Sequence, residues 1–542
     1  MKPDTDFVGP QPNDFVDALT MLLLLILLLR WLNKRTFNIP DSIALSLSAV
    51  TSSILAILVN RLFPHIFIPG LNLDRFRHFT VSFPSFVLDS ALGFLLFADA
   101  AELDIISLRR TVEIIFSLAV FTTLLASFLN ASFLFILLTA TANPLPFAHC
   151  LLFGAIISPT DPIAVNGILK SNKSLLPKLQ RFIINGEALF NDAVAVVLFT
   201  GLRRWIRSPH KVGMGYFVDM VFREVLLGIV IGLVLGYLAY YLLQNIKDKI
   251  LEANVTIVLV LMINMTAKYL GASIPLASVV AGLIIGNYGT IFAMSSSKSF
   301  HWLWQLISDN LNSILYLLMG FISIVLVTLP ESKGSYGANI YYGIFLAMIP
   351  LSLFARFLSI FIPLQCLKFL YLLRGQRLHP ALRNAIPFRF IGVLTWSGMK
   401  GTISVALALS LSEDIESRNL IFQLCYLLVC FSTVVQGLFY EPVIRWLTPP
   451  ISVSVPQLMT SEEKSLLSVS GSIPMILEKD VPKKDQIHRE KTPQLEPLPS
   501  LSDMIRSVGL VAVALHENQR ESSAQSLQNN ATQKKLSITK NR

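Results

Sequence analysis

Residues 158–162, Ser158-Pro159-Thr160-Asp161-Pro162, interrupt an apolar block that runs from about 146 to 168. A block of this length matches the roughly 20 residues that cross a bilayer as a helix. Each proline removes a helical hydrogen bond and clashes with the carbonyl four residues earlier, so the pair predicts an unwound segment. Irregular backbone at membrane depth must face protein or a water-filled cavity, where its carbonyls can coordinate a cation. A structural proline kink is the alternative, and Asp161 between the prolines favours the cation site.

Similar apolar blocks recur along the chain, which has 542 residues, of which 53% are hydrophobic and 14% charged. Ordinary soluble domains carry about 25% charged residues, so the chain is predicted to be an all-α polytopic membrane protein. The net charge of +10 arises mainly from Lys and Arg between the blocks, which indicates membrane topology and not a nucleic-acid partner. The four cysteines lack CxxC spacing, so neither a zinc site nor a disulfide framework is predicted.

We predict about thirteen transmembrane helices, near residues 16–33, 41–60, 85–103, 113–138, 146–168, 182–202, 218–243, 251–267, 274–288, 303–328, 340–371, 389–411 and 419–446. The transmembrane domain is therefore expected at 1–447. Residues 448–542 contain no spanning block and are expected to form a largely disordered tail. The positive-inside rule puts this tail in the cytoplasm and the N-terminus outside, with the chain multi-pass in the cell membrane.

The spacing of the blocks indicates an internal repeat. The eighth span begins about 235 residues after the first, and Gly398-Met399-Lys400-Gly401 interrupts the twelfth span about 240 residues after the interruption in the fifth. Corresponding spans are an odd number apart and cross in opposite senses, so we predict two inverted six-helix repeats with discontinuous crossing helices at spans 5 and 12.

The sixth span places Asp192 close to its middle, within Gly186-Glu187-Ala188-Leu189-Phe190-Asn191-Asp192. An ionisable side chain there costs roughly 2.5–3.5 kcal/mol, which argues for function over a purely structural role. Glu187 and Asn191 are four residues apart and can hydrogen-bond on one helix face. Asp192 is separated from Glu187 by roughly 140° around the helix axis. We therefore expect the two carboxylates to have different roles.

Lys400 lies between two glycines in the twelfth span. A charge buried in a low-dielectric interior needs a partner, and we expect Glu187 to be that partner. The alternative is a lysine whose ammonium group extends to the membrane interface.

These motifs together resemble the monovalent cation/proton antiporters of the sodium/proton exchanger type, including the bacterial sodium/proton antiporters, over about residues 15–447. The resemblance rests on Thr160-Asp161-Pro162, Gly186-Glu187 with Asn191-Asp192, Gly398 to Gly401, and the run from Leu96-Phe97 to Glu102-Leu103-Asp104. It implies thirteen spans in two inverted repeats, and a homodimer.

The resemblance also implies site roles. Asp192 would bind either the cation or the proton, with Asp161 and Thr160 completing a Na⁺ site, while Glu187 would pair with a basic residue of the twelfth span. Asn191 stands where electrogenic relatives carry a second aspartate, which implies electroneutral exchange. This chain has Lys400 where the family usually has arginine, and Ala188 where it often has serine. The missing hydroxyl leaves the preferred cation open.

We therefore predict a secondary active antiporter that exchanges Na⁺, or alternatively Li⁺ or K⁺, for H⁺. A passive cation channel is the second hypothesis and would conduct without proton coupling. No HExxH, GxSxG or GxxxxGK[ST] motif occurs, so an enzyme and a cofactor are not expected. Gly228, Gly232 and Gly236 form a small-residue stripe, predicted to pack within the chain.

Overall fold

The computed structural model describes residues 12–36, 39–62, 90–171, 175–207, 214–246, 248–289, 297–328, 338–373, 387–411, 415 and 417–448. Residues 1–448 form one compact unit, separate from 449–542. The predicted tail therefore lies outside the described residues, apart from Thr448.

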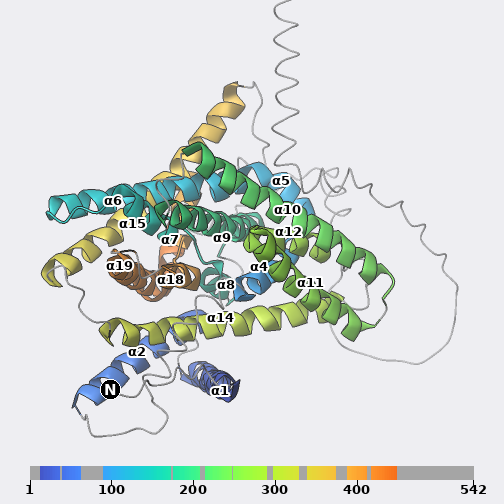
Figure 1. Cartoon of the computed structure of the whole chain (residues 1–542), viewed down its shortest axis with the longest axis horizontal. Coiled ribbons are helices and arrows are strands. Elements are labelled where there is room, and N and C mark those ends of the chain that lie inside the picture. Colours follow the sequence, from blue (N-terminus) through green and yellow to red (C-terminus); the bar gives the residue numbers. More distant parts are fainter. Residues whose placement is uncertain are drawn as a thin grey trace, which may run out of the picture. The chain divides into compact units, whose positions relative to one another are not determined.

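All regular structure in the described ranges is helical (Figure 1). The first half contains α1 (Pro12–Thr36), α2 (Asp41–Leu62), α4 (Leu92–Ala101), α5 (Ile105–Phe116), the π-helical η2 (Ser117–Thr122), α6 (Thr123–Ala140), α7 (Phe147–Ile157), α8 (Pro162–Ser171), α9 (Lys178–Arg207) and α10 (Met214–Gln244). The second half contains α11 (Lys249–Leu270), α12 (Ile274–Ile284), the π-helical η3 (Ile285–Gly289), α14 (Ser297–Thr328), α15 (Ala338–Leu373), α17 (Phe388–Ser397), α18 (Thr402–Leu409), α19 (Arg418–Phe431), the π-helical η4 (Ser432–Gln436) and α20 (Tyr440–Leu447).

Every predicted span coincides with one or more of these helical segments, which confirms the helical membrane fold. Within the described residues, six helices are long and apolar enough to cross a membrane, and the bent pair α17 and α18 makes up to seven. The shorter apolar helices include α4 and α7. The count of thirteen crossings stays a prediction.

Both predicted interruptions are present. α7 ends at Ile157 and α8 begins at Pro162, so the segment between them is non-helical. α17 and α18 meet at a bend of 50° around residues 398–401. The N–H of Asp161 donates to the carbonyl of Met399 at 2.8 Å. The two unwound segments therefore meet where the broken helices cross, as the internal repeat predicted.

Small residues set the spacing of several helices. A Cβ added to Gly154 of α7 would overlap the carbonyl group of Ser127 on α6. A Cβ on Gly232 of α10 would press on Ala277 of α12. Gly236 also faces α12, and Gly228 faces Ser273, the residue before that helix. The predicted glycine stripe therefore packs within the chain.

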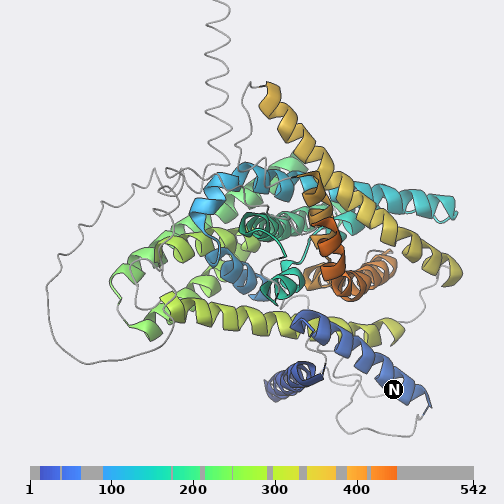
Figure 2. The same ribbon diagram turned by 180° about the vertical axis from the view of Figure 1, so that it is seen from behind.

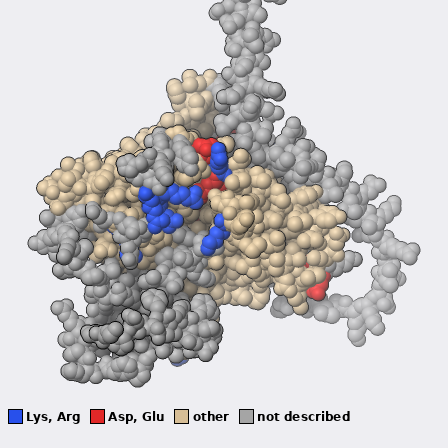
Figure 3. Space-filling view, in the orientation of Figure 1, with Lys and Arg blue, Asp and Glu red and all other residues tan. Residues whose placement is uncertain are grey.

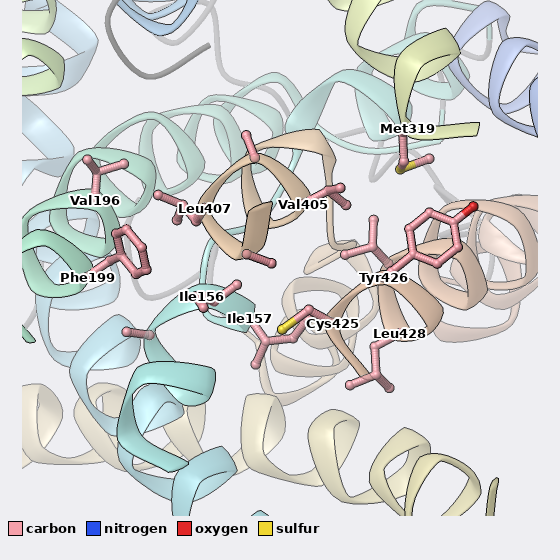
Figure 4. Close-up of a cluster of buried hydrophobic side chains, with 14 of the residues drawn as sticks. Ile156, Ile157, Val196, Phe199, Met319, Val405, Leu407, Cys425, Tyr426 and Leu428 are labelled. Atoms are coloured by element: carbon pink, nitrogen blue, oxygen red, sulfur yellow. The ribbon is translucent and has the colours of Figure 1, made fainter. Parts of the chain in front are cut away.

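The interior around the crossing is apolar. Buried side chains of α7, α9, α14, α18 and α19 form one cluster (Figure 4), including Ile156, Phe199, Met319, Leu407 and Cys425. Figures 1 and 2 show α14 running beside α2 and past α4. On the face shown in Figure 3, most of the charged side chains gather in a small area, and most of the described surface is uncharged. Such a surface suits contact with lipid.

Candidate cation and proton site

A cavity beside the crossing contains the predicted ionisable residues. It encloses about 420 Å³ of empty space, including solvent, and we call it the acidic cavity. Its polar lining includes Asp99, Thr160, Asp161, Asp192, Asn312, Thr402 and Ser404. Asp192 is only 5% exposed. The structure thus brings Asp192, Asp161 and Thr160 to one cavity, and a buried group of carboxylates attracts either protons or a cation.

Asp161 is fixed at the first interruption by both its backbone and its side chain. Besides the backbone bond to Met399, its Oδ2 accepts a hydrogen bond from the hydroxyl of Tyr316 on α14. A Cβ added to Gly401 would overlap the Asp161 side chain. Glycine at 401 is therefore needed for the close approach of the two interruptions, which its extended φ of −123° alone would not require.

The Asn191 side chain of α9 forms hydrogen bonds to a residue of the acidic cavity and to buried residues of α9 and α6. Its Nδ2 donates to Thr160 Oγ1 at 3.1 Å and to Glu187 Oε1 at 3.2 Å. Its Oδ1 accepts from Thr123 Oγ1 at 2.7 Å. The predicted bond between Glu187 and Asn191 is therefore present, and the same amide also holds Thr160 of the unwound segment. Ala188, which is buried one turn before Asp192, supplies no side-chain oxygen.

The expected pairing of Glu187 with Lys400 is wrong. Arg356 of α15 donates from Nη2 to both Glu187 carboxylate oxygens at 3.0 Å, and both side chains are 3% exposed. Lys400 instead directs Nζ to the carbonyl of Ser158 at 3.5 Å. α15 places a guanidinium beside Glu187 of α9, and a single nitrogen of that group, Nη2, contacts both carboxylate oxygens.

The α17–α18 interruption also lines a second cavity, through Gly398 and Lys400. It holds about 330 Å³ of empty space and is lined by Arg356, Gly398, Lys400, Ser352, Ser432 and Gln436, among others. We call it the basic cavity. The interruption therefore contributes Gly401 to the acidic cavity and Lys400 to the basic one.

Side chains of η4 satisfy the backbone of the second interruption. Ser432 Oγ accepts from the Lys400 N–H at 2.8 Å, and Thr433 Oγ1 donates to the Lys400 carbonyl at 3.1 Å. Gln436 Nε2 donates to the Trp396 carbonyl at 2.6 Å, while its Oε1 accepts from Ser432 Oγ at 2.7 Å. We call Ser432, Thr433 and Gln436 the η4 clamp. π-Helical turns are often found at functional sites, and this one replaces lost helical hydrogen bonds.

Sequence reasoning missed Asp99, Asn312 and Arg356. Asp99 lies inside the run from Leu96 to Asp104 that carried part of the resemblance, so its charge in an apolar block was a usable signal. Arg356 stands alone in a long apolar block and carried the same signal. Asn312 has no charge, so it offered none.

The sodium/hydrogen exchanger transmembrane family profile matches residues 21–446. The chain belongs to this exchanger family. It is 33% identical over 433 residues to the Na⁺/H⁺ antiporter NhaP of Pseudomonas aeruginosa, covering 79% of this chain and 96% of the relative. It is 31% identical over 333 residues to the Na⁺/H⁺ antiporter NhaG of Bacillus atrophaeus, covering 60% of this chain and 57% of that one.

A solved structure of an exchanger has the same fold. The sodium proton antiporter MjNhaP1 of Methanocaldococcus jannaschii matches with a TM-score of 0.58 at 16% identity, covering 80% of this chain and 99% of that one. Family membership and the described helices make the chain a multi-pass membrane protein of a transporter family.

Proposed function

We propose that this exchanger-family chain is a secondary active antiporter that exchanges Na⁺ for H⁺ through the acidic cavity. The observation that carries the proposal is the burial of Asp192 in a cavity that it shares with Asp161 and Thr160. Two relatives are named Na⁺/H⁺ antiporters, which supports Na⁺ and H⁺ as the exchanged ions. A buried carboxylate is costly in a membrane unless it has a function.

Competition at Asp192 couples the two fluxes. Its carboxylate can hold a proton or help to coordinate a sodium ion, and occupancy by one weakens binding of the other. Thr160 and Asp161 supply oxygen atoms from the unwound segment, which suits a hard cation. Glu187 is already paired with Arg356, so it serves to hold α9 and α15 together. Asn191 is neutral, which supports an electroneutral exchange of one sodium ion for one proton.

The test uses the full chain in proteoliposomes with an imposed sodium gradient and a pH-sensitive dye inside. Wild-type protein should produce sodium-driven pH changes, and an imposed voltage should leave their rate unchanged. Asp192→Asn should reduce exchange to background because the amide cannot bind a proton. Asp219→Asn, on an exposed part of α10, is the matched control and should remain active. Full activity of Asp192→Asn would contradict the proposal.

The same assay separates the other cations and the channel hypothesis. Replacing Na⁺ by Li⁺ or K⁺ at several pH values ranks the transported cations. A passive channel would carry sodium down its gradient without moving protons in the opposite direction. Sodium flux without a pH change would therefore replace the antiporter proposal by the channel.

We also propose a homodimer in the cell membrane with the C-terminal segment in the cytoplasm. The support is family resemblance for the dimer and the excess of Lys and Arg in alternate loops for the orientation. Cross-linking in native membranes should give a band of twice the chain mass. A C-terminal tag should be accessible to protease only after the cytoplasmic side is opened.

A further inference from the structure

We infer that Asn312 of α14 is a cation-coordinating residue whose side-chain carbonyl oxygen completes the site formed by Asp192, Asp161 and Thr160. This inference rests on the proposed function and adds a neutral ligand from a helix that contributes no predicted site residue. Asn312 lines the acidic cavity together with the three predicted residues.

The first observation is an unpartnered polar atom. Asn312 is 5% exposed, and its Oδ1 is buried without a hydrogen-bond partner. Its Nδ2 donates to Ser308 Oγ at 3.2 Å, which fixes the amide on the face of α14. A buried carbonyl without a partner destabilises the folded protein. A bound cation would remove that destabilisation.

The second observation is the position of α14 beside the site. Tyr316 follows Asn312 by one helical turn, so both lie on the same face of α14. The Tyr316 hydroxyl donates to Asp161, which places this face against the unwound segment. α14 also packs against α4 and α18, two further helices that line the cavity.

The third observation is that the acidic side chains alone do not supply enough oxygen ligands for a cation. Among the described residues, no three acidic, histidine or cysteine side chains converge closely enough to hold a metal ion. Hard cations take several oxygen ligands, which include carbonyl as well as carboxylate groups. Ala188 contributes none beside Asp192. Neutral oxygens must therefore complete the shell, and the free carbonyl of Asn312 is placed to do so.

A carbonyl ligand has a distinct signature. Unlike a carboxylate, an amide does not take up a proton near neutral pH. Losing it should weaken sodium binding while leaving the affinity for the competing proton unchanged. A residue that only maintained the packing of α14 would not produce this separation.

The experiment compares Asn312→Leu, which keeps the size and removes the oxygen, with Asn312→Asp, which keeps an oxygen. In the proteoliposome assay, Asn312→Leu should raise the apparent KM for sodium about ten-fold, as expected for one lost bond to a charged group. The inhibition constant for protons should stay within two-fold of wild type (about 0.4 kcal/mol). Asn312→Asp should retain sodium affinity near or above wild type.

A control on the same helix separates a ligand from a structural role. Asn310→Ala alters a half-buried asparagine of α14 that bonds to the carbonyl of Leu306. It should keep the wild-type KM. If Asn310→Ala raises the KM as much as Asn312→Leu, the effect comes from a general disturbance of α14 and the inference fails.

Direct binding keeps the test independent of transport. Sodium should raise the Tm of the purified full chain above its value in sodium-free buffer, and this rise should be smaller for Asn312→Leu than for wild type or Asn310→Ala. If wild type shows no exchange but this pattern appears, the proposed function fails and the inference stands. Equal sodium-dependent shifts in wild type and Asn312→Leu would overturn the inference alone.

Discussion

The two interrupted helices differ in what their unwound segments carry and in what holds them. The first carries Asp161 into the acidic cavity and is held by the Tyr316 hydroxyl, the Asn191 amide and one backbone bond. The second carries Lys400 to the basic cavity, and the η4 clamp satisfies its peptide groups. The first interruption therefore lines the proposed cation site, whereas the second is a braced support against which the first is positioned.

The largest expected effect concerns the buried ion pair between Glu187 of α9 and Arg356 of α15. Glu187→Gln leaves Arg356 charged in a buried position, so the free energy of unfolding should fall by about 3–5 kcal/mol. Thermal unfolding of the purified protein measures this change.

A double-mutant cycle sharpens the result. Glu187→Gln combined with Arg356→Gln should recover much of the loss, because neither buried charge is then left without a partner. Glu187→Gln combined with Lys400→Gln should recover less. Greater recovery with Lys400→Gln would show that the lysine is the main partner of Glu187.

The η4 clamp should give the next largest effect. Gln436→Leu removes the donor to the Trp396 carbonyl and the acceptor for Ser432. We expect a loss of about 1–3 kcal/mol in unfolding free energy and slower exchange, with little change in sodium affinity. Gln423→Leu, nearer the start of α19, is the matched control. Equal stability of the two variants would remove the argument that the second interruption is braced.

The smallest effect is expected from single hydroxyl groups, and here the two interruptions can be compared directly. Tyr316→Phe removes a donor to Asp161, and Tyr440→Phe removes a contact with Ser397 at 3.0 Å. Each should cost about 0.6–1.7 kcal/mol in stability. Only Tyr316→Phe should change the apparent KM for sodium. A similar KM change in Tyr440→Phe would mean that both interruptions contribute to cation binding.

The sequence was sufficient to predict the crossing helices and three cavity residues. Pro159 and Pro162 break a helix for local steric reasons, and an aspartate at mid-span is costly wherever it occurs. These rules depend on neighbouring residues alone. They therefore placed Asp161 and Asp192 correctly, although their cation-binding role stays a prediction.

The partner of Glu187 could not be derived in the same way. Lys400 and Arg356 both lie in later apolar blocks, and the choice between them depends on which side chain the fold brings to Glu187. The unpartnered carbonyl of Asn312 likewise appears only when α14 is placed beside the cavity. The π-helical turn of the clamp lacks a sequence signature, because its hydrogen-bond spacing follows from packing.

The η4 clamp has a consequence for biosynthesis. A ribosome completes α17 and α18 before it reaches residues 432–436, so the peptide groups of Lys400 and Trp396 are made before their partners. Glu187 likewise waits for Arg356, made 169 residues later. The clamp can therefore form only after η4 has been made, and we expect a chain ended before Ser432 to be a preferred substrate for membrane quality-control proteases.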